Sequence, residues 1–219
     1  MATQQTAPGG RVYRGMTSAE RHDDRRRRLL DAGLELFGTA GYGATTIEGI
    51  CQRAGVTARN FYDHFDGRED LLLAVYGEVV EGHSEQVRAA FGALPDDDLE
   101  GRIHAGVGTA LSLWLADERR ARVAFLEVVG VSPRVEERRL AVIDGYTDML
   151  LGELARFAPR GRAGSAARAR MEIVGNALVG GVVHVLTERL TRPDRAPFEQ
   201  VVDELTRLFV AAIGATIDA

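Results

Sequence analysis

The chain has 219 residues, of which 45% are hydrophobic and 27% are charged, and its net charge is −5 at neutral pH. This length allows one large domain, or a small domain joined to a larger one. The negative charge argues against a protein that coats nucleic acid through bulk positive potential, so any DNA contact must come from the local placement of side chains.

Cysteine usage and hydropathy predict the compartment. The single cysteine, Cys51, rules out an internal disulfide and any multi-cysteine zinc site, which fits a reducing environment. Residues 1–19 lack an apolar segment of signal-peptide length, and we expect no run of the ~18 uncharged apolar residues that a membrane span needs. We therefore expect a cytoplasmic protein with no membrane partner.

A flexible arm over residues 1–16 is expected to precede the first helix. Thr17 and Glu20 have the spacing of a capping box, which favours a helix start. Gly41 stands where a left-handed residue would end that helix. Between these points apolar residues and one glycine recur at three- and four-residue intervals, namely Leu29, Leu30, Gly33, Leu34, Leu36 and Phe37.

Two short helices are expected next. Thr45 and Glu48 have the pattern of a second capping box, which opens a helix that stops near Gly55. Thr57 can cap a third helix that ends near His64.

A fourth helix is expected to start at Asp66, with Glu69 three residues later, and to run to about residue 90. The acidic run 96–98 suits the start of another helix, whose apolar face carries Ile103, Val107, Leu111 and Trp114. Further helices are expected over residues 119–129, 133–157 and 165–190 and from 197 onward. No segment alternates convincingly as a strand would, so we expect an all-α fold.

The segment Ala54-Gly55-Val56-Thr57 joins two short helices in the layout of a helix-turn-helix, whose second helix enters the major groove of DNA. Tyr62, His64 and Arg68 can all donate hydrogen bonds to phosphate oxygens. On spacing alone, ordinary surface residues beside a helical hairpin explain the pattern equally well.

The same residues resemble the tetracycline-repressor (TetR) family of bacterial regulators. The first domain of that family typically contains Thr-Thr, an Ala-Gly-Val turn, a Tyr-x-His/Tyr-Phe segment and Lys-x-x-Leu-Leu. This chain has Thr45-Thr46, Ala54-Gly55-Val56, Tyr62-Asp63-His64-Phe65 and Arg68-Glu69-Asp70-Leu71-Leu72. The resemblance covers about residues 20–80. It implies a helix-turn-helix three-helix domain over residues 17–66 and a helical ligand-binding and dimerisation bundle over residues 67–219.

The resemblance also implies roles for individual residues in DNA binding. Thr46, Tyr62, His64 and Arg68 would contact phosphate, and the start of the third helix would face base edges. There Arg59 suits guanine, and Asn60 suits adenine or the backbone, although the family commonly has other residues at these places. The expected DNA-contacting residues are Thr45, Thr46, Thr57, Ala58, Arg59, Asn60, Tyr62, His64 and Arg68.

For the second domain, the resemblance implies a ligand pocket and a dimer interface. The expected pocket residues are His104, Trp114, Phe125, Tyr146, Met149 and Asn176. Gly175, Gly180 and Gly181 cost helix stability unless close packing rewards them. With the apolar stripe from Phe198 to Ile213, they suggest a helix pair that meets its twofold mate.

The expected function is that of a ligand-responsive, DNA-binding transcriptional regulator: a repressor that binds a palindromic operator as a homodimer and is released by a small hydrophobic molecule. No cofactor, metal or catalytic residue is expected, because Glu100 with His104 and His184 with Glu188 are isolated pairs and no phosphate loop or nucleophile elbow is found. Two alternatives remain open, a ligand-binding or enzymatic helical bundle that ignores DNA and a protein-interaction adaptor.

Overall fold

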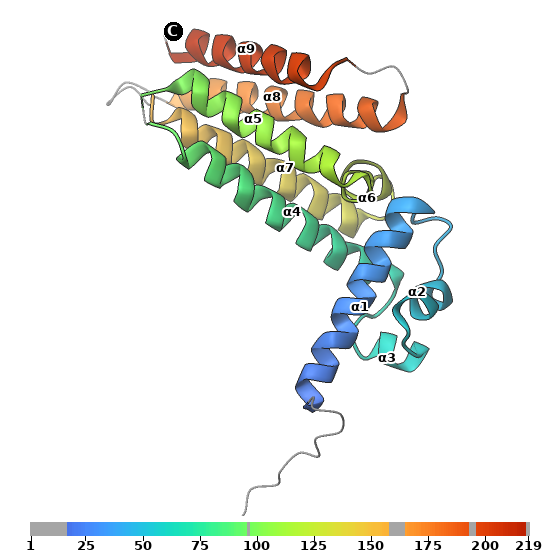
Figure 1. The fold of residues 1–219 in the computed structure, drawn as a ribbon. Coiled ribbons are helices and arrows are strands. Elements are labelled where there is room, and N and C mark those ends of the chain that lie inside the picture. The colour runs from blue at the N-terminus through green and yellow to red at the C-terminus, as the bar shows by residue number, and fades with distance from the viewer. Residues whose placement is uncertain (1–16, 96, 158–164, 193–195, 218–219) are drawn as a thin grey trace, which may run out of the picture.

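The structure is a computed structural model that describes residues 17–95, 97–157, 165–192 and 196–217. Within these ranges all regular secondary structure is helical and no strand occurs, as the sequence predicts (Figure 1). The expected arm over residues 1–16 lies outside the described residues. The helices in chain order are α1 Ser18–Thr39, α2 Ile47–Ala54, α3 Ala58–Tyr62, α4 Arg68–Gly92, α5 Leu99–Ala116, α6 Glu118–Arg122, η1 Val123–Glu127, α7 Pro133–Leu154, α8 Ser165–Thr191 and α9 Phe198–Ile217.

Helix α1 begins and ends as its sequence predicts. The Thr17 hydroxyl accepts a hydrogen bond from the backbone N–H of Glu20 at 3.2 Å, and the Glu20 carboxylate accepts one from the N–H of Thr17. Gly41 follows the helix with φ of +89°, a left-handed conformation that favours glycine. The predicted capping box and the predicted stop are therefore confirmed.

The caps of α2 and α4 differ from the prediction. Thr46, not Thr45, caps α2, since its hydroxyl accepts from the N–H of Gly49 at 3.1 Å. Thr45 instead donates its hydroxyl to the carbonyl of Gly41 at 2.7 Å and is buried. Helix α4 begins after Gly67 without a side-chain cap, so the expected cap at Asp66 is wrong.

Helices α4 to α9 form a bundle, and α1 to α3 lie at one end of it (Figure 1). Helix α4 packs against α5 and α7, α5 against α9, and α7 against α8. The predicted apolar face of α5 is buried in this core at Ile103, Val107, Leu111 and Trp114. Helix α1 reaches both parts, because it packs against α2 as well as against α4 and α6.

The helix expected over residues 119–129 contains a π-helical turn. Helix α6 ends at Arg122, and the π-helical segment η1 follows directly. A π turn inserts one residue into the helical repeat and is common at functional sites. Here it packs against α1, α4 and α8, and Gly130, with φ of +73°, follows it.

The apolar stripe of α9 packs inside the chain. Val202, Leu205, Phe209 and Ile213 are all buried, and α9 packs on α5. The prediction that this stripe meets a twofold mate is therefore wrong, because the chain's own core already uses it.

Helix α8 contains a long apolar stretch that the chain largely leaves uncovered. The segment Arg168–Thr191 is long and apolar enough by composition to cross a membrane, and 17% of its most apolar window is buried. One such helix is weak support for a membrane span, because apolar helices of soluble proteins pass the same test.

Candidate functional site

The first turn of α3 is exposed to solvent, while the opposite side of the helix packs in the core. Thr57 caps the helix by accepting from the N–H of Asn60 at 3.2 Å. Ala58 and Arg59 are exposed, and Asn60 is half-buried. Phe61, with no exposed surface, anchors the opposite side of α3 in the core. Arg59 and Asn60 at the start of the helix are therefore presented to solvent by a backbone that Phe61 anchors in the core.

Two further hydroxyl groups are exposed near this surface. Tyr62 is 57% exposed although it is a large aromatic residue. Thr46 is exposed at the start of α2, and its capping oxygen accepts the N–H of Gly49 while its own hydrogen stays available to an acceptor. Both residues can therefore donate to a phosphate in the way the sequence predicts.

His64 is placed differently from the expectation. Its ring packs against that of His22 on α1, with centroids 4.0 Å apart. Both ring nitrogens are buried, and no described residue bonds to them. Burial and the neighbouring cationic residues lower the pKa of His64, which favours the neutral ring. This conformation gives His64 no exposed donor for phosphate, so it packs α3 against α1 instead.

Arg68 and Thr45 form an internal tie. The Arg68 guanidinium donates to the backbone carbonyl of Thr45 and lies 4.3 Å from the centre of the Tyr42 ring. This contact fixes the start of α4 to the turn that precedes α2. Thr45 is buried with its hydroxyl already bonded, so we drop it from the expected DNA contacts. Any phosphate contact by Arg68 has to use its remaining N–H groups.

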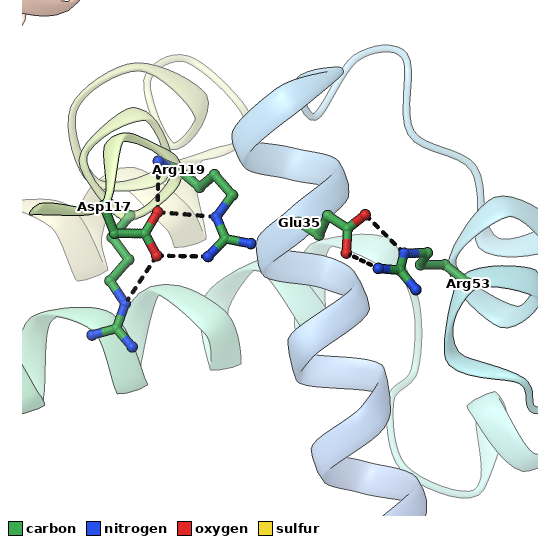
Figure 2. Close-up of polar contacts among 5 residues, drawn as sticks. Glu35, Arg53, Asp117 and Arg119 are labelled. Atoms are coloured by element: carbon green, nitrogen blue, oxygen red, sulfur yellow. Dashed lines mark hydrogen bonds and ion pairs between the residues drawn. The ribbon is translucent and has the colours of Figure 1, made fainter.

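Figure 2 shows polar contacts on two sides of α1: one joins α1 to α2, and the other lies at the junction of α5 and α6, which packs on α1. On one side, Arg53 of α2 donates from Nε to the Glu35 carboxylate at 2.8 Å. On the other, Asp117 accepts two hydrogen bonds from the Arg119 side chain, at 3.0 and 2.8 Å. Gly38 lies directly against Arg119, because a Cβ atom at Gly38 would come within 2.5 Å of the Cβ of Arg119.

A partly buried carboxylate joins η1 to the loop after α1. Glu127, with its side chain 15% exposed, accepts the backbone N–H of Tyr42 at 2.8 Å. The same carboxylate lies 3.6 Å from Nη2 of Arg122. Tyr42 in turn supports Arg68. The last residue of η1 is therefore hydrogen-bonded to the turn that leads into α2.

A cavity of about 480 Å³ lies within the bundle, between α4, α5, η1, α7 and α8. This volume falls in the range of small-molecule pockets. Trp114, Phe125, Tyr146 and Met149 line the cavity, so the structure brings together four of the six expected pocket residues. Its walls are mainly apolar, and the lining includes aliphatic residues of α7 and α8.

The other two expected pocket residues lie elsewhere. His104 is half-exposed on α5, 3.4 Å from Asp203 of α9. Asn176 is exposed on α8, where its side-chain oxygen accepts the hydroxyl of Thr147 at 2.9 Å. Neither residue therefore lines this cavity, and His104 instead lines a second hollow of about 430 Å³ between α5 and α9. Helical period alone did not show which side of α5 and α8 faces inward.

His83 is the main cavity residue that the sequence reasoning missed. It is 5% exposed, its Nδ1 lies 2.6 Å from the Tyr146 hydroxyl, and its Nε2 lies 3.0 Å from the carbonyl of Ala110. Its ring stacks on Trp114 with centroids 4.1 Å apart. The signal in the sequence was a polar residue at i+7 from Tyr76, on an otherwise apolar face of α4.

Burial keeps the histidine and the two tyrosines of the cavity uncharged. Burial lowers the pKa of His83 to about 4, and it raises the pKa of Tyr76 to about 12. The pKa of Tyr146 is raised as well, again by burial. At neutral pH these three groups are neutral, and they act only as hydrogen-bonding partners.

No group of three metal-ligating side chains occurs among the described residues. Cys51 is buried in α2, and burial raises the pKa of its thiol, which makes it a poor nucleophile.

Comparison with known proteins identifies relatives for this chain. Residues 29–75 match the sequence model of the family described as bacterial regulatory proteins, tetR family. The HTH-type transcriptional activator FasR of Mycolicibacterium smegmatis is 30% identical over 153 residues, which are 70% of this chain and 67% of that protein. Other curated relatives are matched over 27% and 52% of their lengths.

Solved structures share the fold. The transcriptional regulator FadR of Bacillus subtilis, in complex with stearoyl-CoA, has a TM-score of 0.72 at 17% identity, over 85% of this chain and 98% of that one. AibR, in complex with isovaleryl coenzyme A and operator DNA, has a TM-score of 0.63 at 18% identity, over 84% of this chain and 97% of that one. At these identities the likeness concerns the fold.

Proposed function

The chain belongs to the TetR family of DNA-binding transcriptional regulators, and we propose that it binds an operator as a homodimer and responds to a small, mainly apolar molecule in the cavity of the bundle. We further propose a division into an arm over residues 1–16, a DNA-binding domain over 17–66 and a ligand-binding and dimerisation domain over 67–219. The protein would work in the cytoplasm, without an enzymatic reaction.

The DNA contacts proposed for this chain follow the exposure of its side chains. Arg59 and Asn60 would read base edges in the major groove. Thr46 and Tyr62 would hold phosphates beside it. Arg59 carries no ion pair with any described residue, so its guanidinium is free to pair with a guanine.

The proposed dimer interface is the uncovered face of α8 together with the outer side of α9. Ile173 is 71% exposed and Leu208 is 55% exposed. Gly180 and Gly181 are exposed on the same face of α8, and nothing lies within 4 Å of a Cβ atom built on either. Such small residues permit the close approach of a second helix, and exposed apolar surface of this kind favours association.

The observation that carries the ligand response is the position of η1. Ala124, Phe125 and Leu126 line the cavity, and the next residue, Glu127, bonds to the turn before α2. A molecule that repositions Phe125 would therefore move a residue hydrogen-bonded to the DNA-binding domain. A ligand shifts such an equilibrium only if it binds one conformation better than the other.

Acyl-coenzyme A thioesters are the first ligands to test, because two structural neighbours are complexes with them. Duplexes would be selected from a random library with the purified chain, and binding would be followed by fluorescence anisotropy at several salt concentrations. We expect a salt-dependent complex on an enriched palindrome. Enrichment of no sequence would contradict the proposed function.

Repression remains the prediction from the sequence for the direction of the response. A relative, FasR, is named an activator. A reporter gene placed behind the selected palindrome, with and without the protein, distinguishes the two.

A further inference from the structure

The cavity wall carries a single charged side chain. Among the described residues that line the cavity, Arg139 is charged and no Asp or Glu is present. The remaining polar groups include Tyr76, His83, Tyr146 and Thr187. A charge that a ligand buries in protein needs an opposite charge or several hydrogen bonds. The wall therefore offers a partner to an anion and offers none to a cation.

The polar pair inside the cavity has no donor left for an anion. A carbonyl oxygen only accepts, so Nε2 of His83 must carry the hydrogen that Ala110 receives at 3.0 Å. The other nitrogen, Nδ1, then accepts the Tyr146 hydroxyl at 2.6 Å. Because both hydrogens are used within the protein, an anionic group beside this pair would be left unpaired. Arg139 is the charged group of the wall that remains for it.

Arg139 is held in position with donors to spare. Its Nε and Nη2 donate to the two oxygens of Glu136, at 2.9 and 2.6 Å. A guanidinium has five N–H donors, which leaves three for a second acceptor. The Arg139 side chain is 24% exposed, so it lies where the cavity wall meets solvent. An incoming head group can reach it without full desolvation.

The cavity is elongated. The lining residues of α4 extend from Tyr76 to Phe91, a distance of about 22 Å along a helix. Those of α7 extend from Arg139 to Leu150, about 16 Å. An extended chain suits this shape better than a compact polycyclic molecule.

Two cross-contacts give the direction of α4 and α7. Asp70 lies 3.1 Å from Nη2 of Arg134 near the start of both helices, and His83 bonds to Tyr146 further along both. The two helices therefore run in the same direction. Arg139, near the start of α7, lies at the end of the cavity closest to the DNA-binding helices.

We infer that the ligand is an elongated amphiphile with an anionic head group, which Arg139 binds, and with an aliphatic chain that runs along α4 toward Phe91. The inference deepens the proposed function and rests on it for the regulatory meaning of the site. A carboxylate of a free fatty acid and the phosphates of an acyl-coenzyme A share this chemistry. The inference predicts that a cationic amphiphile does not bind in this cavity.

Displacement of a neutral fluorescent probe, N-phenyl-1-naphthylamine, from the full chain tests the inference without DNA. Four competitors share one chain length: decanoate, decanoyl-CoA, decanol and decyltrimethylammonium. We expect at least one of the two anions to displace the probe at a concentration tenfold or more below that of decanol, and the cation not to displace it. Which anion is stronger identifies the source of the head group.

Substitutions at α7 assign the head group to Arg139. Arg139→Gln should weaken binding of the anion by about tenfold or more and leave decanol within twofold, whereas Arg139→Lys should keep most of the affinity. Arg138→Gln is the matched control, because Arg138 is exposed one position away. This variant should change neither the affinity for the anion nor that for decanol. Glu136→Gln, which frees the guanidinium, should leave anion binding equal or stronger.

Three results would overturn the inference: displacement by the cation as strong as by the anions, displacement by neither anion, or an Arg139→Gln variant that binds the anion like the wild type. Unfolding of each variant by urea verifies that the fold is intact. Because the assay contains no DNA, its failure leaves the proposed regulator untouched. Conversely, an anion that binds and never changes DNA affinity would contradict the proposed function alone.

Discussion

Replacement of Gly38 by alanine tests the contact between α1 and α6. The added Cβ atom would lie 2.5 Å from the Cβ, 2.7 Å from the Cα and 2.8 Å from the carbonyl oxygen of Arg119. Contacts this short require a shift, and two of these three atoms belong to the backbone, so rotation of the Arg119 side chain cannot relieve them. Overpacking of this kind costs about 1–3 kcal/mol, while alanine in a helix gains about 1 kcal/mol over glycine.

Gly77→Ala is the matched control for Gly38→Ala. Gly77 lies within α4, and nothing lies within 4 Å of a Cβ atom built there, so this variant should gain up to about 1 kcal/mol. Urea unfolding followed by circular dichroism measures both free energies of unfolding. We expect Gly38→Ala to be about 2 kcal/mol less stable than Gly77→Ala. Equal stability of the two variants would refute the close packing of α1 on α6.

Three further predictions concern the DNA surface, the cavity and the contact between domains. Arg59→Ala should relax sequence preference at the selected palindrome by about 1–3 kcal/mol, whereas Tyr62→Phe should weaken binding to all duplexes alike. Anisotropy with matched and mutated duplexes separates the two effects. Equal loss of specificity in both variants would contradict these roles. The pKa of His83 in the folded protein is about 4, below the ~6.5 of an unfolded histidine. The unfolded state therefore binds more protons, and the free energy of unfolding should fall as the pH drops from about 6.5 to 4, by up to 1.4 kcal/mol per pH unit. Urea unfolding at several pH values should show a shallower pH dependence in His83→Gln, and an unchanged slope would argue against the neutral ring. Glu127→Ala removes the acceptor of the Tyr42 N–H and should lower the free energy of unfolding, measured in urea, by about 1–3 kcal/mol. The same variant should reduce the effect of the ligand on DNA affinity. A full ligand response in this variant would show that the signal takes another route.

The fold was largely predictable because helix signals in this chain are local. The capping box of Thr17 and Glu20 and the left-handed Gly41 both appear in the structure where the sequence places them. Errors at the next caps were small shifts, since Thr45 and Thr46 are chemically identical and only the turn after Gly41 decides which hydroxyl faces the helix. The π turn of η1 left no pattern in the sequence that distinguishes it from an α-helix.

The functional residues were less predictable, because their roles depend on packing between elements far apart in the chain. His64 and Arg68 are suited to phosphate by chemistry, but contacts with α1 and with the turn before α2 occupy or bury them. His104 and Asn176 have the right periods but lie on the outer faces of their helices. His83 could be recognised as a cavity residue only from its hydrogen-bond partners, Tyr146 and Ala110, which are distant in the sequence.

One measurement tests the ligand response of this regulator most directly. The selected duplex is titrated with the full chain by anisotropy, with and without an anionic amphiphile at a concentration that the displacement assay shows to be saturating. Coupling between the cavity and the DNA-binding helices predicts a change of about tenfold in the dissociation constant, and a smaller change in Glu127→Ala. An unchanged dissociation constant with the cavity occupied would contradict the coupling through η1.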